Sequence, residues 1–142
     1  MSITLRVAPP EHYRWIAARA RLNIGNGFMA YEVVKNGTVP ERIVGMVGFD
    51  GWTASSVSMH IVIDDPMVLR RLIKLSFGVA FCEFGKEVVT VTVLSTNTRS
   101  LKLVKGLGFC EVYRGKDWVD HGVDLVIHEM RRHECRWLKE TN

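Results

Sequence analysis

The stretch from Glu87 to Arg114 constrains the fold of this chain most, because it has the pattern of a strand, a helix and a second strand in direct succession. Valines alternate with threonines between Glu87 and Leu94, which indicates a half-buried strand. Asn97 to Lys105 has the pattern of a short capped helix, and Gly106 and Gly108 after it allow a sharp return into a strand at 109–114. Such a unit excludes all-helical and all-strand folds and predicts an α/β layer fold.

The rest of the chain predicts further elements of the same architecture. Pro9-Pro10 opens a helix that we expect Gly25 and Gly27 to end. Asn36-Gly37 predicts a tight turn between two strands, and Asp64-Asp65-Pro66 predicts the start of a long helix. We expect an α/β (α+β) fold with a central mixed, mostly antiparallel sheet flanked by helices. The other expected elements are strands at 28–35, 42–49, 55–63 and 123–130, a helix at 67–84, and a polar loop between 114 and 123.

Composition fits a single globular domain over residues 1–142. The sequence is 47% hydrophobic and 24% charged, and no linker or repeat divides it. No apolar run approaches the roughly 20 residues of a membrane span, and the N-terminus lacks the apolar stretch of a secretory signal, so we predict a cytoplasmic protein. Nineteen basic and 15 acidic residues give a net charge of +4. That charge favours phosphate-bearing ligands but is too small to predict nucleic-acid binding by itself.

The segment Asn97–Phe109, NTRSLKLVKGLGF, resembles the N-x-x-[AS]…L-G-F signature that follows the fifth strand in GNAT-superfamily N-acetyltransferases. The expected order of elements matches that superfamily over nearly the whole chain. The ending Glu129–Leu138 resembles the tail of small phage-type members. The resemblance implies a GNAT-like fold that binds acetyl-CoA and transfers the acetyl group to a primary amine by direct attack.

The resemblance also implies where acetyl-CoA binds. In the family a glycine-rich loop between the fourth strand and the long helix cradles the pyrophosphate, whereas here Asp64–Arg71 reads DDPMVLRR, without glycine. The helix N-terminus and its arginines would replace that loop, and backbone N–H groups of the fourth strand would face the developing oxyanion. The basic residues of the short helix are equally explained by a solvated helix face. The predicted cofactor-binding residues are Val62, Ile63, Arg70, Arg71, Asn97, Arg99 and Lys102.

Two residues are candidate catalytic groups. His60 lies in the strand that the resemblance makes the fourth, bordering the acceptor site, and an imidazole can take a proton from an ammonium nucleophile near neutral pH. The alternative for His60 is a hydrogen-bonded histidine on a sheet face. Ser95 is a candidate for hydrogen-bonding the leaving sulfur, or else a turn residue. The tyrosine that protonates the departing thiolate in many members is replaced by Val104.

Two other functions stay open. A catalytically silent GNAT-fold module that binds a protein partner is favoured by the missing phosphate loop and tyrosine. A nucleic-acid-associated phage protein is favoured only by the pI of about 9.1 and the basic helices. We expect the acceptor pocket to be formed by the loops at 24–28 and 116–121, with Trp52 beside them.

The end of the chain carries two further expectations. Trp137 and Leu138 are apolar residues beyond the last strand, which predicts a tail packed against the body or against a second subunit in a homodimer. His128, His133 and Cys135 lack the spacing of a tetrahedral metal-ligand set, so no metal site is predicted.

Overall fold

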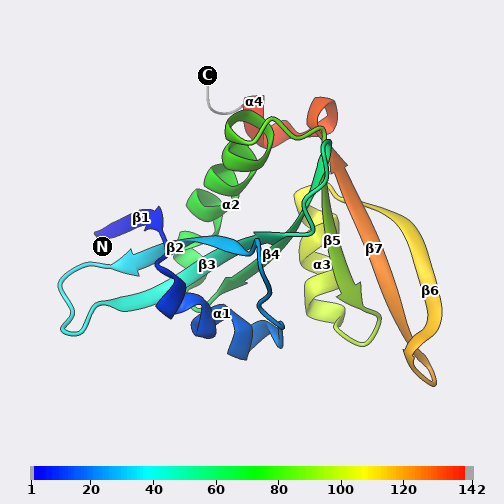
Figure 1. The fold of residues 1–142 in the computed structure, drawn as a ribbon, viewed down its shortest axis with the longest axis horizontal. Helices are drawn as coiled ribbons and strands as arrows, with labels where there is room; N and C mark the ends of the chain where they lie inside the picture. Colours follow the sequence, from blue (N-terminus) through cyan, green and yellow to red (C-terminus); the bar gives the residue numbers. More distant parts are fainter. Residues whose placement is uncertain (1, 140–142) are drawn as a thin grey trace.

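The computed structural model describes residues 2–139. Seven strands form one sheet in the order β1-β2-β3-β4-β5-β7-β6, in which only β4 and β5 run parallel. This is the mixed, mostly antiparallel sheet predicted from the sequence (Figure 1). None of the helices within residues 2–139 has the length and apolar character needed to cross a membrane.

The strands are β1 (Ile3–Val7), β2 (Met29–Lys35), β3 (Arg42–Asp50), β4 (Ser56–Ile63), β5 (Val88–Leu94), β6 (Cys110–Asp120) and β7 (Val123–Arg131). The helical segments are η1 (Pro10–His12), α1 (Tyr13–Ala20), η2 (Pro66–Val68), α2 (Leu69–Phe77), the π-helix η3 (Gly78–Glu83), α3 (Thr98–Leu107), η4 (Arg132–Glu134) and α4 (Arg136–Lys139).

Helices cover both faces of the sheet, with α1 on one face and α2 on the other (Figure 1). The main core lies under α2, where alternate strand residues such as Phe49 and Met59 pack with Leu72 and Phe77. A smaller cluster that includes Ile16, Phe28 and Met46 lies under α1. The period-two alternation of strand side chains therefore places the even-numbered residues of β4, and those of β3 from Met46 to Asp50, on the α1 face. Nearer the start of β3 a register shift against β2 reverses the alternation, and Val44 packs in the main core. His60, on β4, lies on that face.

The N-terminal region departs from expectation in two ways. β1 was not predicted, because its stability comes from antiparallel pairing with β2, a partner almost 30 residues away along the chain. The first helix ends at Arg21, in the left-handed conformation with φ 55°, and not at Gly25 and Gly27. The N–H of Leu22 donates to the carbonyl of Ala17 at 3.1 Å and satisfies one of the last helical carbonyls.

Two further elements differ in extent. The expected helix at 67–84 is continuous, but its winding changes from η2 to α2 and then to the π-helix η3. The expected loop between 114 and 123 is largely strand, because β6 continues to Asp120. Pairing of β6 with β7 shifts register between Gly115 and Asp120, and Asp117 has φ 60° there. The polar composition of this segment reflects an exposed edge strand and not a loop.

The tail packs on the body of the molecule, as one of the two expected arrangements requires. The Trp137 side chain is buried, and its indole Nε1–H donates to the carbonyl of Leu107 at 3.0 Å. Leu138 packs against the main core. A second subunit is therefore not needed to cover these apolar residues.

Candidate active site

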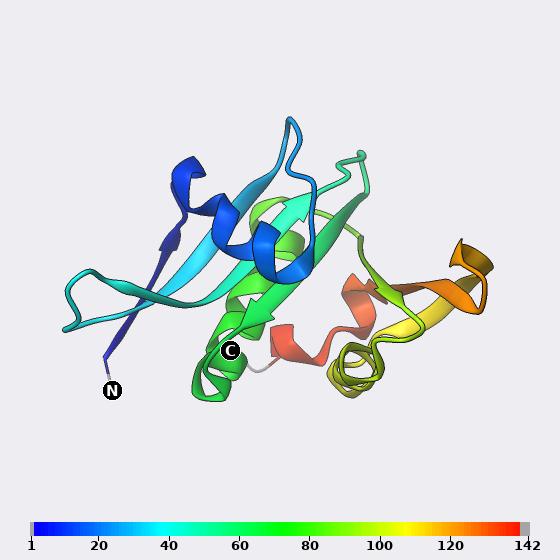
Figure 2. The same ribbon diagram turned by 90° about the horizontal axis from the view of Figure 1, so that it is seen from below.

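The sheet opens between β4 and β5. The two strands pair over only three residues each, Ser56–Ser58 with Val88–Thr90, and then diverge toward their carboxyl ends (Figure 2). Beyond Ser58, β4 keeps its pairing with β3 on its other edge. Backbone groups of β4 that point toward β5 are therefore free of ladder partners in this part of the sheet, which gives a wedge-shaped site with donors along one side.

Val62 and Ile63 lie in this diverging part of β4. They oppose Met46 and Gly45 of β3 in regular antiparallel register. In such a pair, successive residues direct their N–H groups to opposite edges of the strand, so one of these two N–H groups points toward β5. This matches the place that the sequence analysis assigns to an oxyanion donor, whose role stays a prediction.

His60 lies two residues beyond the last paired residue of β4, at the apex of the opening. Its Nε2 lies 2.8 Å from Oδ1 of Asp50, and the two side chains are 21% and 35% exposed. Asp50 is brought there by register, because Gly48 opposes His60 and Asp50 is the next β3 residue on the same face. A carboxylate on Nε2 orients the ring and leaves Nδ1 as the nitrogen that can take up a proton. The pair therefore has the arrangement of a carboxylate-oriented general base.

The turn after β4 has a geometry that bears directly on phosphate binding. The N–H groups of Asp64 and Asp65 donate to the carbonyl of Val44, and that of Met67 donates to the Asp65 carboxylate at 3.0 Å. Val68 donates to the carbonyl of Asp65, and Leu69 donates to that of Pro66. Every backbone N–H from 64 to 69 thus has a protein acceptor, and Asp65 holds the position that an anion would take at the helix N-terminus.

The charged residues around this turn are also placed by the structure. Arg19 of α1 pairs with the Asp64 carboxylate, with Nη2 and Oδ2 3.2 Å apart, and turns that charge toward α1. Arg70 lies over the ring of Trp137, with its Cζ 5.8 Å from the ring centroid, so it faces the tail. Arg71 is exposed on α2. The two arginines therefore point to different surroundings.

Residues predicted on the far side of the opening lie at the end of β5 and on α3. Ser95 joins β5 to β7, because its N–H donates to the carbonyl of Asp124 and its hydroxyl accepts from the N–H of that residue at 2.8 Å. Acting as an acceptor, the hydroxyl keeps its own proton for another partner. Asn97 caps α3 by accepting from the N–H of Ser100 at 3.1 Å. Arg99 and Lys102 are exposed on α3, whereas Val104 is buried.

Of the two loops expected to form the acceptor pocket, the first is found beside Trp52 and the second is mostly strand. Trp52 contacts the first, because its indole Nε1–H donates to the carbonyl of Gly27 at 2.6 Å. It also packs edge-on against Phe84, with ring centroids 5.0 Å apart. Residues 116–120 of the second belong to strand β6, so only the turn at 121–122 remains of that loop.

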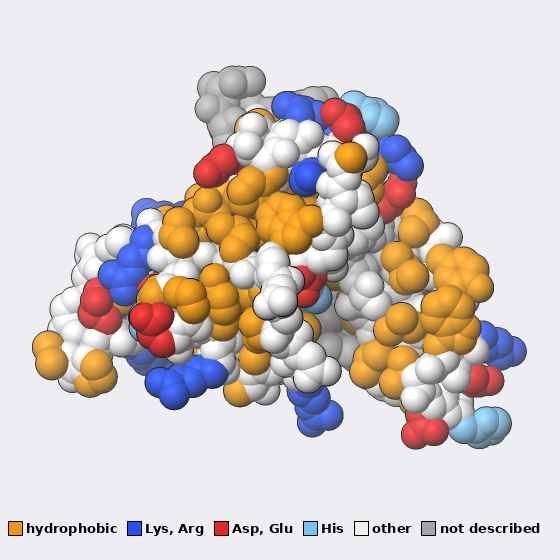
Figure 3. Space-filling model, viewed as in Figure 1, with side chains coloured by type: hydrophobic (Ala, Val, Ile, Leu, Met, Phe, Trp, Pro, Cys, Tyr) orange, Lys and Arg blue, Asp and Glu red, His pale blue; other side chains and the backbone are white. Residues whose placement is uncertain are grey.

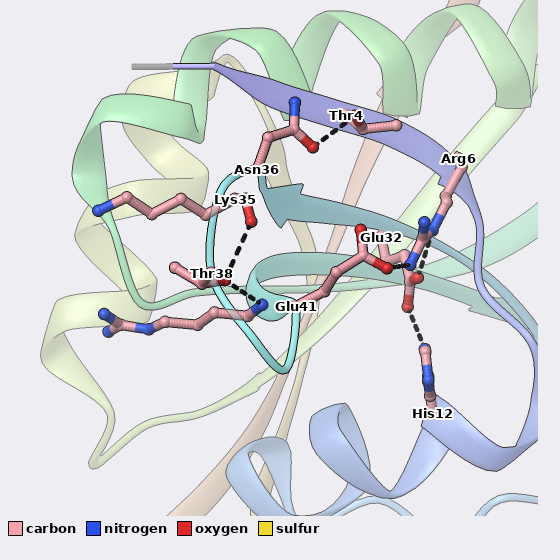
Figure 4. Close-up of polar contacts among 9 residues, drawn as sticks. Thr4, Arg6, His12, Glu32, Lys35, Asn36, Thr38 and Glu41 are labelled. Carbon is pink, nitrogen blue, oxygen red and sulfur yellow. Dashed lines mark hydrogen bonds and ion pairs between the residues drawn. The ribbon is translucent and has the colours of Figure 1, made fainter.

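Sequence reasoning did not identify Asp50 or a second carboxylate–histidine pair beneath β1. Glu32 is fully buried, with Oε2 2.8 Å from Nε of Arg6 and Oε1 2.7 Å from Nδ1 of His12 (Figure 4). Arg6 also reaches Glu41 at 3.4 Å, and its hydrogen bond to Glu32 raises the pKa of its guanidinium. A lone glutamate inside the apolar strand β2 is the sequence signal that indicates this cluster. It links β1, η1 and β2 and lies apart from the β4–β5 opening.

The fold, with this splayed pair of parallel strands, is shared with solved structures of GNAT-fold N-acetyltransferases. Mutant forms of the spermidine/spermine N-acetyltransferase SpeG from Vibrio cholerae superimpose with a TM-score of 0.77 and 14% sequence identity, over 99% of this chain and 100% of that one. SpeG in complex with manganese ions gives 0.74 and 15%, over 99% and 97% of the chains. A dodecameric SpeG structure gives 0.70 and 15%, over 99% and 98%. No protein-family model and no curated sequence matches the chain.

Proposed function

We propose that this protein is an acetyl-CoA-dependent N-acetyltransferase that acts on a primary amine. The observation that carries the proposal is the position of the His60–Asp50 pair at the apex of the β4–β5 opening. Solved structures of similar fold include those of spermidine N-acetyltransferases, which adds support for the class of reaction. Acetyl-CoA supplies a thioester whose carbonyl carbon an amine can attack.

The residues of the chain have separate tasks in this reaction. The Nδ1 atom of His60 takes the proton that the acceptor ammonium loses, and the Asp50 carboxylate stabilises the resulting imidazolium. The free N–H of Val62 or Ile63 donates to the developing oxyanion. The Ser95 hydroxyl donates to the leaving sulfur, because Val104 stands where many family members have a tyrosine. Transfer needs no covalent acyl-enzyme.

Binding of the cofactor phosphates must rely on side chains in this protein. The backbone N–H groups after β4 are occupied, so the usual cradle does not fit a pyrophosphate here. Arg71, Arg99 and Lys102 are exposed cationic residues on the two helices that follow β4 and β5, and Arg70 adds charge beside the tail. Arg71→Ala should weaken acetyl-CoA binding by about 1–3 kcal/mol, measured by calorimetry. If the variant and the wild type bind acetyl-CoA with equal affinity, the phosphates do not bind at Arg71 of α2.

A catalytically silent GNAT-fold module is the second candidate, and the occupied N–H groups favour it. The discriminating experiment measures acetyl transfer to a panel of amines. Spermidine is included because the neighbours act on it, and peptides are included because the net charge of +4 gives no long-range attraction for a polycation. The phage origin and the cytoplasmic location predicted from the sequence stay predictions.

The test of mechanism compares two variants of the pair. His60→Ala should lower kcat/KM by about 10²–10⁴-fold with little change in acetyl-CoA affinity, and the acidic limb of the rate profile should disappear. Asp50→Asn should lower the rate less, because the imidazole remains. If both variants keep the rate and the acidic limb of the wild type, His60 is a structural histidine and the base lies elsewhere.

We also propose that the chain forms a homodimer through β6. This edge strand exposes Val112, Tyr113, Trp118 and Val119, which are 47–59% accessible. Figure 3 shows hydrophobic side chains gathered on that side of the molecule. An edge strand that exposes large apolar side chains between its polar ones is suited to pairing with a second copy. Sedimentation should give a dimer for the wild type and a monomer for Trp118→Asp, whereas a monomeric wild type would refute the assignment.

A further inference from the structure

A pocket of about 380 Å³ lies between α3 and the strands β6 and β7. None of its lining residues belongs to β4 or β5, so it is separate from the proposed active site. Its lining combines apolar side chains with cations, a carboxylate, a thiol and an imidazole. The residues are Leu101, Lys105, Phe109, Cys110, Glu111, Arg114 and His128.

His128 is the unusual member of this lining. It lies on β7 between Val91 of β5 and Glu111 of β6, is 5% exposed, and its Nδ1 has no hydrogen-bond partner among residues 2–139. Buried polar side-chain atoms nearly always have a partner, because an unpaired one loses its hydration without compensation. An unpartnered imidazole nitrogen beside a pocket therefore points to a group that the protein itself does not supply.

The charges around the pocket indicate the sign of that group. Arg114 is neutralised within the protein, since it pairs with Glu111 at 2.9 Å and with Asp124 at 3.3 Å. The hydrogen bond from Arg114, with the charge of that guanidinium, lowers the pKa of Glu111, which keeps the carboxylate ionised and paired. Lys105 makes no ion pair with any residue of the described chain. Its charge is left to attract an anion.

The residues that line the pocket also indicate the chemical class of the ligand. Leu101 and Phe109 offer apolar surface, and a volume in the hundreds of Å³ is the size of small-molecule sites. Within residues 2–139, no group of three or more histidine, cysteine or acidic side chains is placed to hold a metal ion. An organic anion with an apolar body fits these features better than a metal or an inorganic anion does.

We propose that this pocket binds a small organic carboxylate with an apolar body. The carboxylate pairs with the Lys105 ammonium and accepts a hydrogen bond from the His128 imidazole, while the apolar part packs on Leu101 and Phe109. Because Nδ1 is itself closed to solvent, binding turns the imidazole ring about its Cβ–Cγ bond and brings a ring nitrogen to the pocket. The ligand thereby satisfies the unpaired nitrogen.

The experiment is an NMR titration of the full-length, isotope-labelled protein with phenylacetate as the probe, in the absence of acetyl-CoA. We expect saturable shifts of the His128 ring signals and of amides in α3 and β6. Lys105→Met should weaken binding about tenfold or more, the loss of one charge-assisted contact. Lys102→Met is the matched control, since it removes the same charge from the same helix outside the pocket, and should leave phenylacetate binding unchanged.

Several outcomes would overturn the proposal. One is the absence of saturable shifts at His128, and another is equal weakening by the two lysine variants, which would indicate general attraction of anions. If neutral phenylacetamide binds as tightly as phenylacetate, the pocket does not recognise a carboxylate and the proposal is wrong. His128→Phe should abolish binding while the amide spectrum elsewhere stays that of the folded wild type. None of these readouts depends on acetyl transfer, so they test the pocket independently of the proposed function.

Discussion

Gly48→Ala should destabilise the protein although alanine suits a strand better than glycine. A Cβ at this position would lie 2.3 Å from Cζ and 2.6 Å from Cε2 of Phe28, where carbon atoms normally stay about 3.5–4.0 Å apart. The ring would have to move by about 1 Å. It is held by Tyr13, whose ring packs edge-on against it with the centroids 4.9 Å apart.

The expected magnitude follows from two opposing effects. Overpacking of this kind costs about 1–3 kcal/mol, while replacing glycine in a strand returns about 0.5–1 kcal/mol. We expect a net loss of about 1–2 kcal/mol in the free energy of unfolding, measured by urea denaturation, and a fall in Tm of roughly 3–8 °C. Because Gly48 lies opposite His60 in the sheet, the substitution should also disturb the proposed base.

Two further variants test whether the loss of stability comes from the collision with the Phe28 ring. Phe28→Leu removes the colliding ring atoms, so Gly48→Ala should cost clearly less in that background, which a double-mutant cycle measures. Gly78 is a control, because it is helical and a Cβ there meets nothing within 4 Å. Gly78→Ala should stabilise the protein by about 0.5–1 kcal/mol. A Gly48→Ala variant as stable as the wild type would show that the close approach of Phe28 to β3 is wrong.

Two other predictions concern stability. Trp137→Ala should cost about 3–5 kcal/mol in chemical denaturation, because it empties a buried site and leaves the Leu107 carbonyl without its indole donor; a loss below about 1 kcal/mol would mean that the tail is not docked in solution. Arg114→Met should raise the pKa of Glu111 toward its ordinary value, followed by NMR titration of the carboxyl group. Since a lowered pKa gives stability that is lost as pH falls through the acid range, the variant should lose less stability than the wild type between about pH 5 and pH 3; identical acid profiles would contradict the pairing.

The parts of the fold that depend on local pattern were predictable from the sequence. The strand, helix and strand between Glu87 and Arg114 were recognised because alternation, the Asn97 cap and the Gly108 turn act within a few residues of each other. The structure confirms the cap and gives Gly108 a φ of 110°. β1 was missed because its partner strand is distant in sequence. The extension of β6 was missed because an exposed edge strand has the polar composition of a loop.

In the candidate site too, features set by local pattern were predictable and features set by contacts between distant segments were not. His60 could be singled out from its strand, but its pairing with Asp50 depends on the register of β3 against β4, which no local pattern encodes. The missing glycine-rich loop was visible in the sequence. The occupation of every N–H from 64 to 69 was not, because two of them bind the carbonyl of Val44 on a neighbouring strand. Roles that depend on contacts between distant segments therefore required the structure.

Calorimetric titration of the full chain with acetyl-CoA tests the central claim most directly. We expect saturable binding at a single site, weakened by Arg71→Ala and by raised salt, because side-chain charge and not a backbone cradle holds the phosphates. The same titration with His60→Ala should give nearly the wild-type affinity. Absence of saturable binding up to about 1 mM acetyl-CoA, an affinity weaker than about −4 kcal/mol, would contradict the assignment of this protein as an acetyltransferase.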